Sequence, residues 1–423
     1  MVEIELKFQI SEARRTALLK ALDPKKSETI QLQAKYFDTP DRLLAQHGAA
    51  LRQRLEGTRW IQTLKAAGKS HLHRFEHNHN LGELESSPEL DLSIYEAIPE
   101  AQQILTQALG VDAAALKLTF ETDIQRTYRV IEFEDAEIEV CLDVGVVRAS
   151  GREQTIHEVE FELKSGSVQS LLAFSFEWVK KYQLWLDVRS KAEMGNLLAL
   201  EQTVSPARFE KEFVLSKKES AAHNLSLLIG QQMQHLLPNI AAISAGVAEQ
   251  SHIDQAQTAL EHLQLTLALF KDWNSNISDK WAMQLAAFKH QFDHLQHLQH
   301  MQSTLGAFLQ NPTTTENLAK DILYAQEKLG NLVKSTQNVH HYLELLTFSL
   351  SSHDQVQKQD LKTYAHNTLQ NQYRQLQESL NAADISHFES LDVLAQKIKE
   401  LKFSFPILTS IYDVKNLQKY SKA

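Results

Sequence analysis

Hydrophobic and polar positions follow two different patterns along this chain. Up to about residue 200, apolar and polar residues alternate in short runs separated by turn residues. This alternation predicts β-strands near residues 2–9, 32–39, 49–55, 59–66, 71–80, 117–130, 137–147 and 156–164. Three segments between them have helical spacing: 11–22, 99–109 and 167–182. In the rest of the chain apolar residues recur every three or four positions, which predicts helices near 217–236, 251–272, 279–309, 315–350, 355–381 and 388–402.

Eight strands are enough to close an antiparallel barrel whose interior is filled or holds a ligand. The predicted fold class is therefore an α+β N-terminal domain, an eight-stranded antiparallel β-barrel with flanking helices, followed by an all-α helical bundle. Residues 1–206 contain nine of the 13 glycines and five of the eight prolines, so the turn-rich part ends there. We accordingly expect one domain over residues 1–203 and a second over residues 212–423.

Composition narrows the possible functions. The formal net charge of −10 argues against a general nucleic-acid binder, which would carry a basic stripe. Cys141 is the single cysteine, so neither an intramolecular disulfide nor a multi-thiolate metal site can form. The first residues carry acids where a signal peptide needs a basic start, and no apolar run has the length of a membrane span. We expect a cytoplasmic protein that binds neither nucleic acid nor membrane.

Charged residues occupy one face of several predicted strands. Glu3, Glu5 and Lys7 alternate with apolar residues, and a strand has a side-chain period of two, so the three charges share one face. In a single strand this is the ordinary pattern of a solvated face. The pattern recurs, however, in other strands, with the pairs Arg52 and Arg54, Thr63 and Lys65, Arg74 and Glu76, and Glu139 and Asp143, and with the run Glu158, Glu160, Glu162 and Lys164.

The apolar faces of these strands can pack against the flanking helices, which would turn the charges toward the barrel interior. Unpaired buried charges cost several kcal/mol each, by rough estimate. Clustered carboxylates beside clustered Lys and Arg are explained if metal cations and a polyanion bind between them. Carboxylates suit Mg²⁺ or Mn²⁺, and Lys and Arg suit phosphate.

Together, seven ordered motifs resemble the CYTH superfamily, the triphosphate tunnel metalloenzymes. They are Glu3-x-Glu5-x-Lys7, Tyr36-Phe37-Asp38-Thr39, Leu51-Arg52-x-Arg54, Thr63-x-Lys65, Arg74-x-Glu76, Glu158-x-Glu160-x-Glu162 and Ser190-Lys191. The resemblance covers roughly residues 1–200 and implies an eight-stranded tunnel, a substrate with a triphosphate group, and dependence on Mg²⁺ or Mn²⁺.

When the functional residues of the family are matched to this sequence one by one, the resemblance implies roles for three groups of side chains. The implied metal ligands are Glu3, Glu5, Glu158 and Glu160. The implied contacts to substrate phosphate are Lys7, Arg52, Arg54, Lys65, Lys191 and a mid-barrel arginine, for which we choose Arg126 over the nearby Arg129. The further acids Glu162, Glu76 and Asp143 are expected to support catalysis, by activating water or by holding a second metal.

The helical half resembles the CHAD domain, a helical bundle often found behind a CYTH domain. The likeness lies in the segment from Ile253 to Phe270, which ends in Leu267-Ala268-Leu269-Phe270. Asp254 stands where the family pattern has a histidine, and Gln257, Glu261, His262 and Gln264 stand where basic residues are expected. We therefore expect a structural or partner-binding bundle, whose remaining surface Lys and His leave contact with polyphosphate open.

The activity expected from these features is hydrolysis of inorganic triphosphate to pyrophosphate and phosphate. An adenylate cyclase or a thiamine triphosphatase would use the same tunnel, because each substrate presents the same triphosphate group. A non-catalytic polyphosphate or nucleotide binder is the alternative from another class, and loss of one acid pair would favour it. The sequence retains both pairs.

Overall fold

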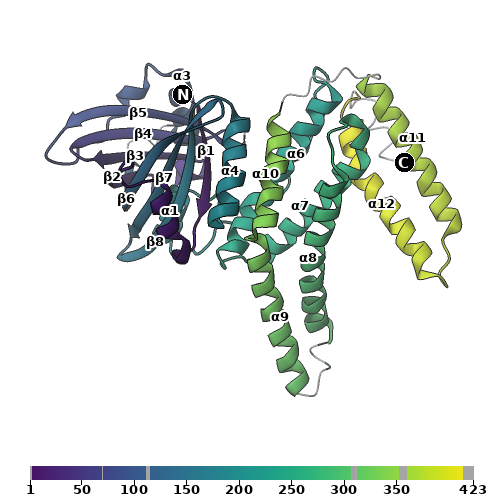
Figure 1. The fold of residues 1–423 in the computed structure, drawn as a ribbon. Helices are drawn as coiled ribbons and strands as arrows, with labels where there is room; N and C mark the ends of the chain where they lie inside the picture. Colours follow the sequence, from purple (N-terminus) through teal and green to yellow (C-terminus); the bar gives the residue numbers. More distant parts are fainter. Residues whose placement is uncertain are drawn as a thin grey trace. The chain divides into compact units, whose positions relative to one another are not determined.

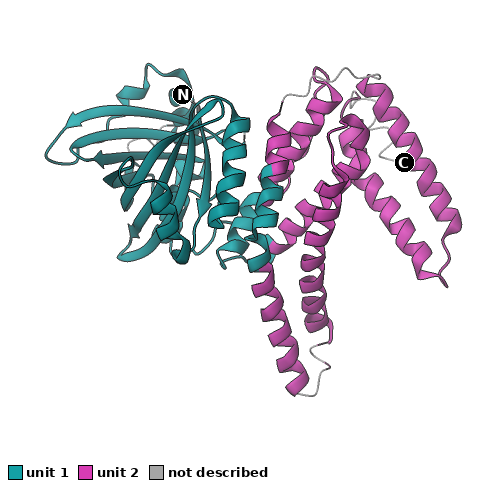
Figure 2. Ribbon diagram, viewed as in Figure 1, with its two compact units in different colours: residues 1–207, 237–252, 330–343 teal, residues 208–236, 253–329, 344–423 magenta. Residues whose placement is uncertain are grey.

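The computed structural model describes residues 2–68, 70–110, 115–305, 308, 312–351 and 360–412. The chain forms a β-rich part followed by helices (Figure 1). Contacts divide it into two compact units that do not correspond to a single cut in the sequence (Figure 2). The first unit contains residues 1–207, 237–252 and 330–343, and the second contains residues 208–236, 253–329 and 344–423.

A closed antiparallel barrel forms the centre of the first unit. Its strands are β1 (Val2–Gln9), β2 (Glu28–Asp38), β3 (Ala49–Glu56), β4 (Arg59–Ala67), β5 (His73–Glu83), β6 (Lys117–Phe133), β7 (Ala136–Ala149) and β8 (Arg152–Ser165). They are hydrogen-bonded in the order β5-β4-β3-β2-β6-β7-β8-β1, and a short pairing of β1 with β5 closes the ring. The predicted eight-stranded antiparallel barrel is thus confirmed. A two-residue strand, β9 (Trp185–Leu186), extends the pairing of β1 and was not predicted.

Apolar residues on the outer face of the barrel pack beneath helices, as the alternation predicts. The helices α1 (Glu12–Ala21), α3 (Pro99–Leu109) and α4 (Val168–Tyr182) lie close to their predicted positions. Phe8 of β1 and Phe161 of β8 are fully buried, and Phe161 meets Phe174 of α4 edge-on at 5.2 Å between ring centroids. On the other side, Leu51, Leu64 and Phe75 form one cluster with residues of α3. Because the outer faces are covered in this way, the alternate, charged positions face the barrel interior.

Two helices of this unit had no sequence signal. The four-residue α2 (Leu43–Gln46) depends on Asp38, whose buried carboxylate accepts hydrogen bonds from the backbone N–H groups of Leu44 and Ala45 at 2.9 and 3.0 Å. Helix α5 (Lys191–Ala199) begins at Ser190, whose hydroxyl accepts from the N–H of Glu193 at 3.0 Å. It is a short helix of weak amphipathic character, which explains why periodicity does not reveal it.

Helix α5 packs tightly onto the barrel through a glycine. The Tyr36 and Phe120 rings are stacked at 4.3 Å, and a Cβ at Gly195 would lie 2.1 Å from the Phe120 ring. Met194 of the same helix joins the apolar cluster around these rings. The first residue of α5, Lys191, is thereby held at a fixed position beside β8.

The C-terminal half is helical, as predicted. Its helices are α6 (Ala221–Ser244), α7 (Gln250–Leu269), α8 (Asp279–Leu305), α9 (Pro312–Val333), α10 (Thr336–Leu350), α11 (Leu361–Ala382) and α12 (Phe388–Thr409). Parts of two predicted helices, at residues 306, 307 and 309 and at 355–359, lie outside the described residues. No helix in the described part of the chain has the combination of length and hydropathy required to cross a membrane.

The prediction of one helix over 315–350 is wrong, because the chain breaks between α9 and α10. The side-chain amide of Asn338 donates to the carbonyl oxygen of Leu332 at 2.8 Å, and the N–H of Asn338 donates to the hydroxyl of Ser335 at 3.4 Å. These bonds satisfy a carbonyl at the end of α9 and an N–H at the start of α10. Side-chain capping of this kind is compatible with continuous apolar periodicity, so the pattern alone does not reveal the break.

Replacing Gly195 with Ala is expected to destabilise the barrel. Overpacking against the buried Phe120 ring destabilises the fold by about 1–3 kcal/mol. The higher helix propensity of Ala stabilises the helix by only about 1 kcal/mol. Chemical denaturation followed by tryptophan fluorescence measures the difference. Gly330→Ala is the matched control, because its nearest neighbour is a carbonyl oxygen 3.8 Å away and the gain in propensity should remain. Equal stability gains in both variants would contradict the packing described for α5.

Candidate functional site: an ionic lumen

Strand pairing places the predicted charged residues on one face of the sheet. Residues directly opposite each other on neighbouring strands have side chains on the same side. Glu3 lies opposite Arg74, and Lys65 lies opposite Glu76. Across the other side of β1, Lys7 lies opposite Glu160, and Asp143 lies opposite both Arg126 and Glu158. The lumen is therefore lined by acids and bases from most of the strands, which is the geometry expected from the alternation.

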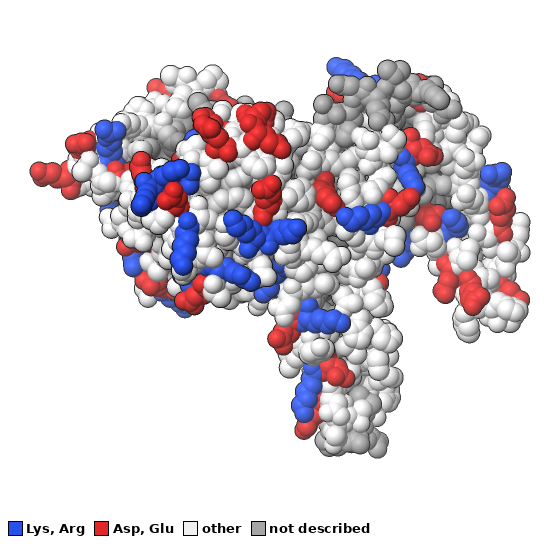
Figure 3. All heavy atoms as spheres, in the orientation of Figure 1, with Lys and Arg blue, Asp and Glu red and all other residues white. Residues whose placement is uncertain are grey.

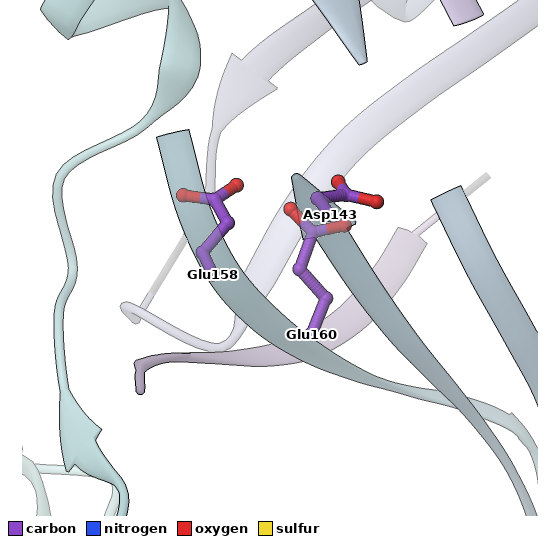
Figure 4. Close-up of side chains that lie close together, drawn as sticks. All are labelled: Asp143, Glu158 and Glu160. Carbon is purple, nitrogen blue, oxygen red and sulfur yellow. The ribbon is translucent and has the colours of Figure 1, made fainter. Parts of the chain in front are cut away.

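Three carboxylates form the tightest acidic group. Asp143 of β7 and Glu158 and Glu160 of β8 point toward one another (Figure 4), and each offers an oxygen within 4.8 Å of the others. Asp143 and Glu158 are completely buried. In the described ranges this is the one such group of His, Cys, Asp or Glu side chains.

Two cations hold this group together. The Lys191 ammonium lies 2.7 Å from Asp143 and 2.8 Å from Glu160, and it also contacts Glu158. Arg126 forms a two-bond pair with Asp143, at 2.7 and 2.6 Å, and contacts Glu160 at 2.5 Å. The choice of Arg126 over Arg129 agrees with the strand register, since Arg129 lies an odd number of residues away and has the opposite orientation.

These contacts determine the charge state of the carboxyl groups. Burial raises the pKa of Glu158. Burial also opposes ionisation of Glu160, but Lys191 and Arg126 outweigh it and hold the pKa of Glu160 well below its ordinary value. The pKa of Asp143 is lowered for the same reason, with Arg126 as the stronger partner. At least two of the three carboxylates are therefore anionic at neutral pH.

The donor set of this group fits a hard divalent cation. Carboxylate oxygens from adjacent strands are the ligands that Mg²⁺ and Mn²⁺ prefer. Oε2 of Glu158 is buried, makes no hydrogen bond with the described residues and lies 3.4 Å from Nζ of Lys7. A buried carboxylate oxygen without a hydrogen bond is costly, and metal coordination would satisfy it.

The acids of β1 are engaged differently. Glu3 accepts from Lys65 at 2.8 and 3.0 Å, and Glu5 pairs with Arg74 at 2.8 Å. Glu76 lies 3.3 Å from Lys65. Burial, only partly offset by Lys65, raises the pKa of Glu3 to about 8. For Glu76, burial is outweighed by Lys65 and by its hydrogen bond with Glu3, so its pKa falls to about 2. The structure does not bring Glu3 and Glu5 into the three-carboxylate group.

A third set of lumen residues has buried donors that lack acceptors. Arg52 lies 3.8 Å from Glu76 and donates to the Tyr36 hydroxyl at 3.3 Å, and Arg54 contacts Glu56. Nevertheless Nε of both arginines and Nζ of Lys7 are buried without a hydrogen-bond partner among the described residues. Burial and the neighbouring Arg52 guanidinium lower the pKa of Arg54, so its charge is incompletely balanced. This part of the lumen has donors and positive charge available for an anion.

The remaining predicted acid, Glu162, lies apart from the three-carboxylate group. It lies opposite Glu5 and Glu139 in the sheet and accepts from Lys164 at 2.9 Å. Burial raises its pKa. Among the described residues its second oxygen accepts no hydrogen bond, whereas both oxygens of Asp143 accept from Arg126.

Sequence analysis missed Asp187, which fixes the segment leading into Lys191. Its carboxylate is buried and accepts from Gln9 at 3.1 Å and from the Arg189 side chain at 3.0 and 2.8 Å. Its own N–H donates to the carbonyl oxygen of Lys7 at 3.0 Å. Asp187 thus links two of the predicted phosphate-binding lysines, Lys7 and Lys191, through the backbone. An isolated Asp between the short strand β9 and helix α5 carries no periodic signal, so only the fold identifies it.

The fold and the lumen together define a β-barrel tunnel protein whose interior is lined by charged side chains. Residues 1–195, which contain the whole barrel, match the family model of the CYTH domain. On the face shown in Figure 3, acidic and basic residues are interspersed over the barrel rather than gathered by sign. The ionic character that distinguishes this domain lies inside it.

Parts of this chain are similar to several known proteins. An inorganic triphosphatase of Haemophilus influenzae is 33% identical over 227 residues, which cover 52% of this chain and 62% of the relative. The chain thus spans less than two thirds of the curated relative that it matches. A Hippeastrum protein described as an adenylyl cyclase with dominant triphosphatase activity is 18% identical over 48% of this chain and 97% of its own, with a TM-score of 0.33. The CHAD domain of Ricinus communis is 11% identical over 52% of this chain and 75% of its own, with a TM-score of 0.43.

Removing the Asp187 carboxylate is expected to destabilise the first unit strongly. Asp187→Ala leaves the buried Arg189 guanidinium unpaired, which costs about 3–5 kcal/mol for a buried pair. Chemical denaturation of Asp187→Ala, Arg189→Met and the double variant measures the coupling. The double variant should recover much of the loss, because it leaves no unpaired charge. Additive losses in the double variant would show that the pair is not coupled.

Proposed function

We propose that the barrel lumen binds inorganic triphosphate and hydrolyses it to pyrophosphate and phosphate with Mg²⁺ or Mn²⁺ as cofactor. The observation that carries the proposal is a set of buried donors, on Lys7, Arg52 and Arg54, that have no hydrogen-bond partner among the described residues. The same lumen contains an acidic group suited to a metal ion. A linear phosphate chain with a divalent ion would complete both sets. The name of the Haemophilus influenzae relative, inorganic triphosphatase, is consistent with this substrate.

The cationic residues are proposed to hold the phosphate chain in place. Arg52 and Arg54 alternate on one strand, and their guanidinium groups can each donate two parallel hydrogen bonds to phosphate oxygens. Lys65, Arg126 and Lys191 are already paired with carboxylates, so they can shift toward phosphate when a cation takes over those carboxylates. Positive groups fixed in a lumen stabilise the charge that develops on the transferred phosphoryl group.

Asp143, Glu158 and Glu160 are proposed to hold the metal, with Glu3 and Glu5 as the further ligands that the motif implies. When bound, the divalent ion would neutralise negative charge on the phosphate oxygens. Glu3 and Glu5 would then have to exchange their present partners, Lys65 and Arg74, for the ion.

Hydrolysis needs a water molecule and a group that accepts its proton. We assign this role to Glu162, because one of its oxygens accepts no hydrogen bond from the described residues, whereas both oxygens of Asp143 accept from Arg126. The water oxygen attacks the terminal phosphorus and its proton passes to Glu162. The bond between that phosphorus and the bridging oxygen breaks, and pyrophosphate leaves. Glu76, held by Lys65 and Arg52, is assigned to keep these two cations in position.

The wider setting is part of the same proposal. We infer a reducing, cytoplasmic location, supported by the buried, free thiol of Cys141. We further propose that residues 1–203 are the catalytic domain and that residues 212–423 form a CHAD-like bundle. Its contact with polyphosphate remains a prediction.

Substrate comparison tests the activity directly. The purified protein is incubated with inorganic triphosphate, ATP or thiamine triphosphate, each with Mg²⁺ and with Mn²⁺, and phosphate release and cyclic products are measured. Release from inorganic triphosphate should exceed release from the other two substrates. Formation of cyclic AMP would identify a cyclase instead, and tight binding without product would identify a binding protein.

Truncating Arg54 is expected to weaken productive binding of triphosphate. A hydrogen bond from a charged donor contributes about 1.5–3 kcal/mol. Its loss in the transition state lowers kcat/KM roughly 10- to 100-fold. Arg54→Lys should restore part of the loss, since the charge remains. The control is Arg59→Ala on β4, whose side chain is 65% exposed, and its kinetics should match those of the unmodified protein. Unchanged kinetics for Arg54→Ala would contradict the proposed role.

Neutralising Glu160 is expected to weaken metal binding at least tenfold and to abolish turnover, because one anionic oxygen donor is lost. Titration calorimetry with Mn²⁺ in the absence of substrate measures the metal, and circular dichroism checks the fold of Glu160→Gln. Glu153→Gln, on the same strand but half exposed, serves as control. Unaltered Mn²⁺ affinity for Glu160→Gln would reject the proposed metal site, even if activity were lost.

A further inference from the structure

Helix α12 presents an exposed stripe that the rest of its unit leaves uncovered. Its buried residues are confined to the last turns, at Phe403, Ser404, Ile407 and Leu408. Over residues 388–402 no side chain is buried, although the helix continues the apolar pattern. The stripe consists of side chains at spacings of three and four, which share one side of the helix: Phe388, Leu391, Ala395, Ile398, Lys402 and Phe405.

The exposure of this α12 stripe is unusual for its residue types. Phe388 is 78% exposed, and Ile398 and Phe405 are each 50% exposed. Ile385, in the turn before the helix, is 86% exposed. Contiguous exposed apolar residues on a folded protein usually indicate a binding surface, whereas single ones need no explanation.

The stripe is complementary to a second copy of itself that runs in the opposite direction. If two copies of α12 cross antiparallel about a two-fold axis at Ala395, residues whose distances from Ala395 are equal or differ by one residue become neighbours. Leu391, four residues before Ala395, then lies next to Ile398 of the other copy, three residues after it, and Ile385 meets Phe405. Phe388 meets Lys402, whose ammonium group can lie over the aromatic ring. Each exposed apolar side chain of the stripe thus obtains an apolar or cationic partner, and the small Ala395 allows close approach at the centre.

Charges beside the stripe follow the same symmetry. Asp392 and Lys399 flank it on one side, three residues before and four residues after Ala395. In the antiparallel arrangement Asp392 of each copy faces Lys399 of the other, which gives two reciprocal pairs of opposite charge. Lys399 also contacts Glu261 of α7 at 2.5 Å, which places its side chain beside the stripe, and it remains about half exposed. Asp392 has no ion pair with any described residue.

From this combination of exposure, register and charge we propose that α12 is a homodimer interface, in which a second copy of this chain packs its own α12 antiparallel across the stripe. The proposal does not depend on the activity of the barrel. A two-fold arrangement favours a second copy over an unrelated partner, because the stripe by itself supplies both halves of every contact. The helical unit then has a function in assembly that is separate from the lumen.

Sedimentation velocity of the full chain over a wide concentration range tests the assembly. A monomer–dimer equilibrium is expected, and Ala395→Glu should raise its dissociation constant by more than about tenfold, because two carboxylates would meet at the axis. Asp392→Lys should weaken the dimer by placing like charges opposite each other, and the double variant Asp392→Lys with Lys399→Asp should restore it. Circular dichroism confirms that each variant stays folded.

Crosslinking tests the register. Ala395→Cys should form an intermolecular disulfide on mild oxidation, since the two residues meet at the axis. Gln396→Cys is the matched control, because the next residue along the helix faces away from the stripe and should not crosslink. A chain that is monomeric at all concentrations would overturn the proposal and assign the stripe to another occupant, such as residues 413–423. A dimer unaffected by Ala395→Glu, or equal crosslinking at both positions, would overturn it as well.

Discussion

Confinement of charge inside a closed barrel is the constraint on which the rest of this structure depends. An ionised group removed from water is tolerated only when opposite charges and hydrogen bonds surround it. The lumen meets this condition by pairing cations and carboxylates across neighbouring strands, as in Arg74 with Glu5 and Arg126 with Asp143. Some of these ions, such as Lys191 and Arg126, have more than one partner of opposite charge.

Lys191 is the clearest case of this mutual support. It contacts all three carboxylates of the acidic group, yet it belongs to α5 rather than to a barrel strand. Its position is set by the cap at Ser190, by the buried Asp187 upstream and by the close packing of Gly195 on Phe120 downstream. The position of Lys191 is thus set by residues of its own segment and by the packing of α5 on the barrel.

Much of this arrangement could be predicted from the sequence, for a definite reason. A strand has a period of two, so Glu3, Glu5 and Lys7 had to share a face whatever their neighbours were. What the period cannot give is which strands become neighbours. Asp143 joins Glu158 because β7 pairs with β8, and Glu5 pairs with Arg74 because β1 closes on β5. The contacts of Asp187 and the break between α9 and α10 depend on hydrogen bonds of individual side chains, which leave no periodic trace.

The closing strand also has a consequence for the order in which the protein is made. β1 is synthesised first, but its partners are β5, which begins at His73, and β8, which ends at Ser165. During translation its polar backbone must remain without its final partners until more than a hundred further residues have emerged. Such long-range pairing slows folding and leaves a strand exposed to other chains meanwhile. The charges of β1 that later line the lumen would keep that waiting strand hydrated and would discourage its aggregation.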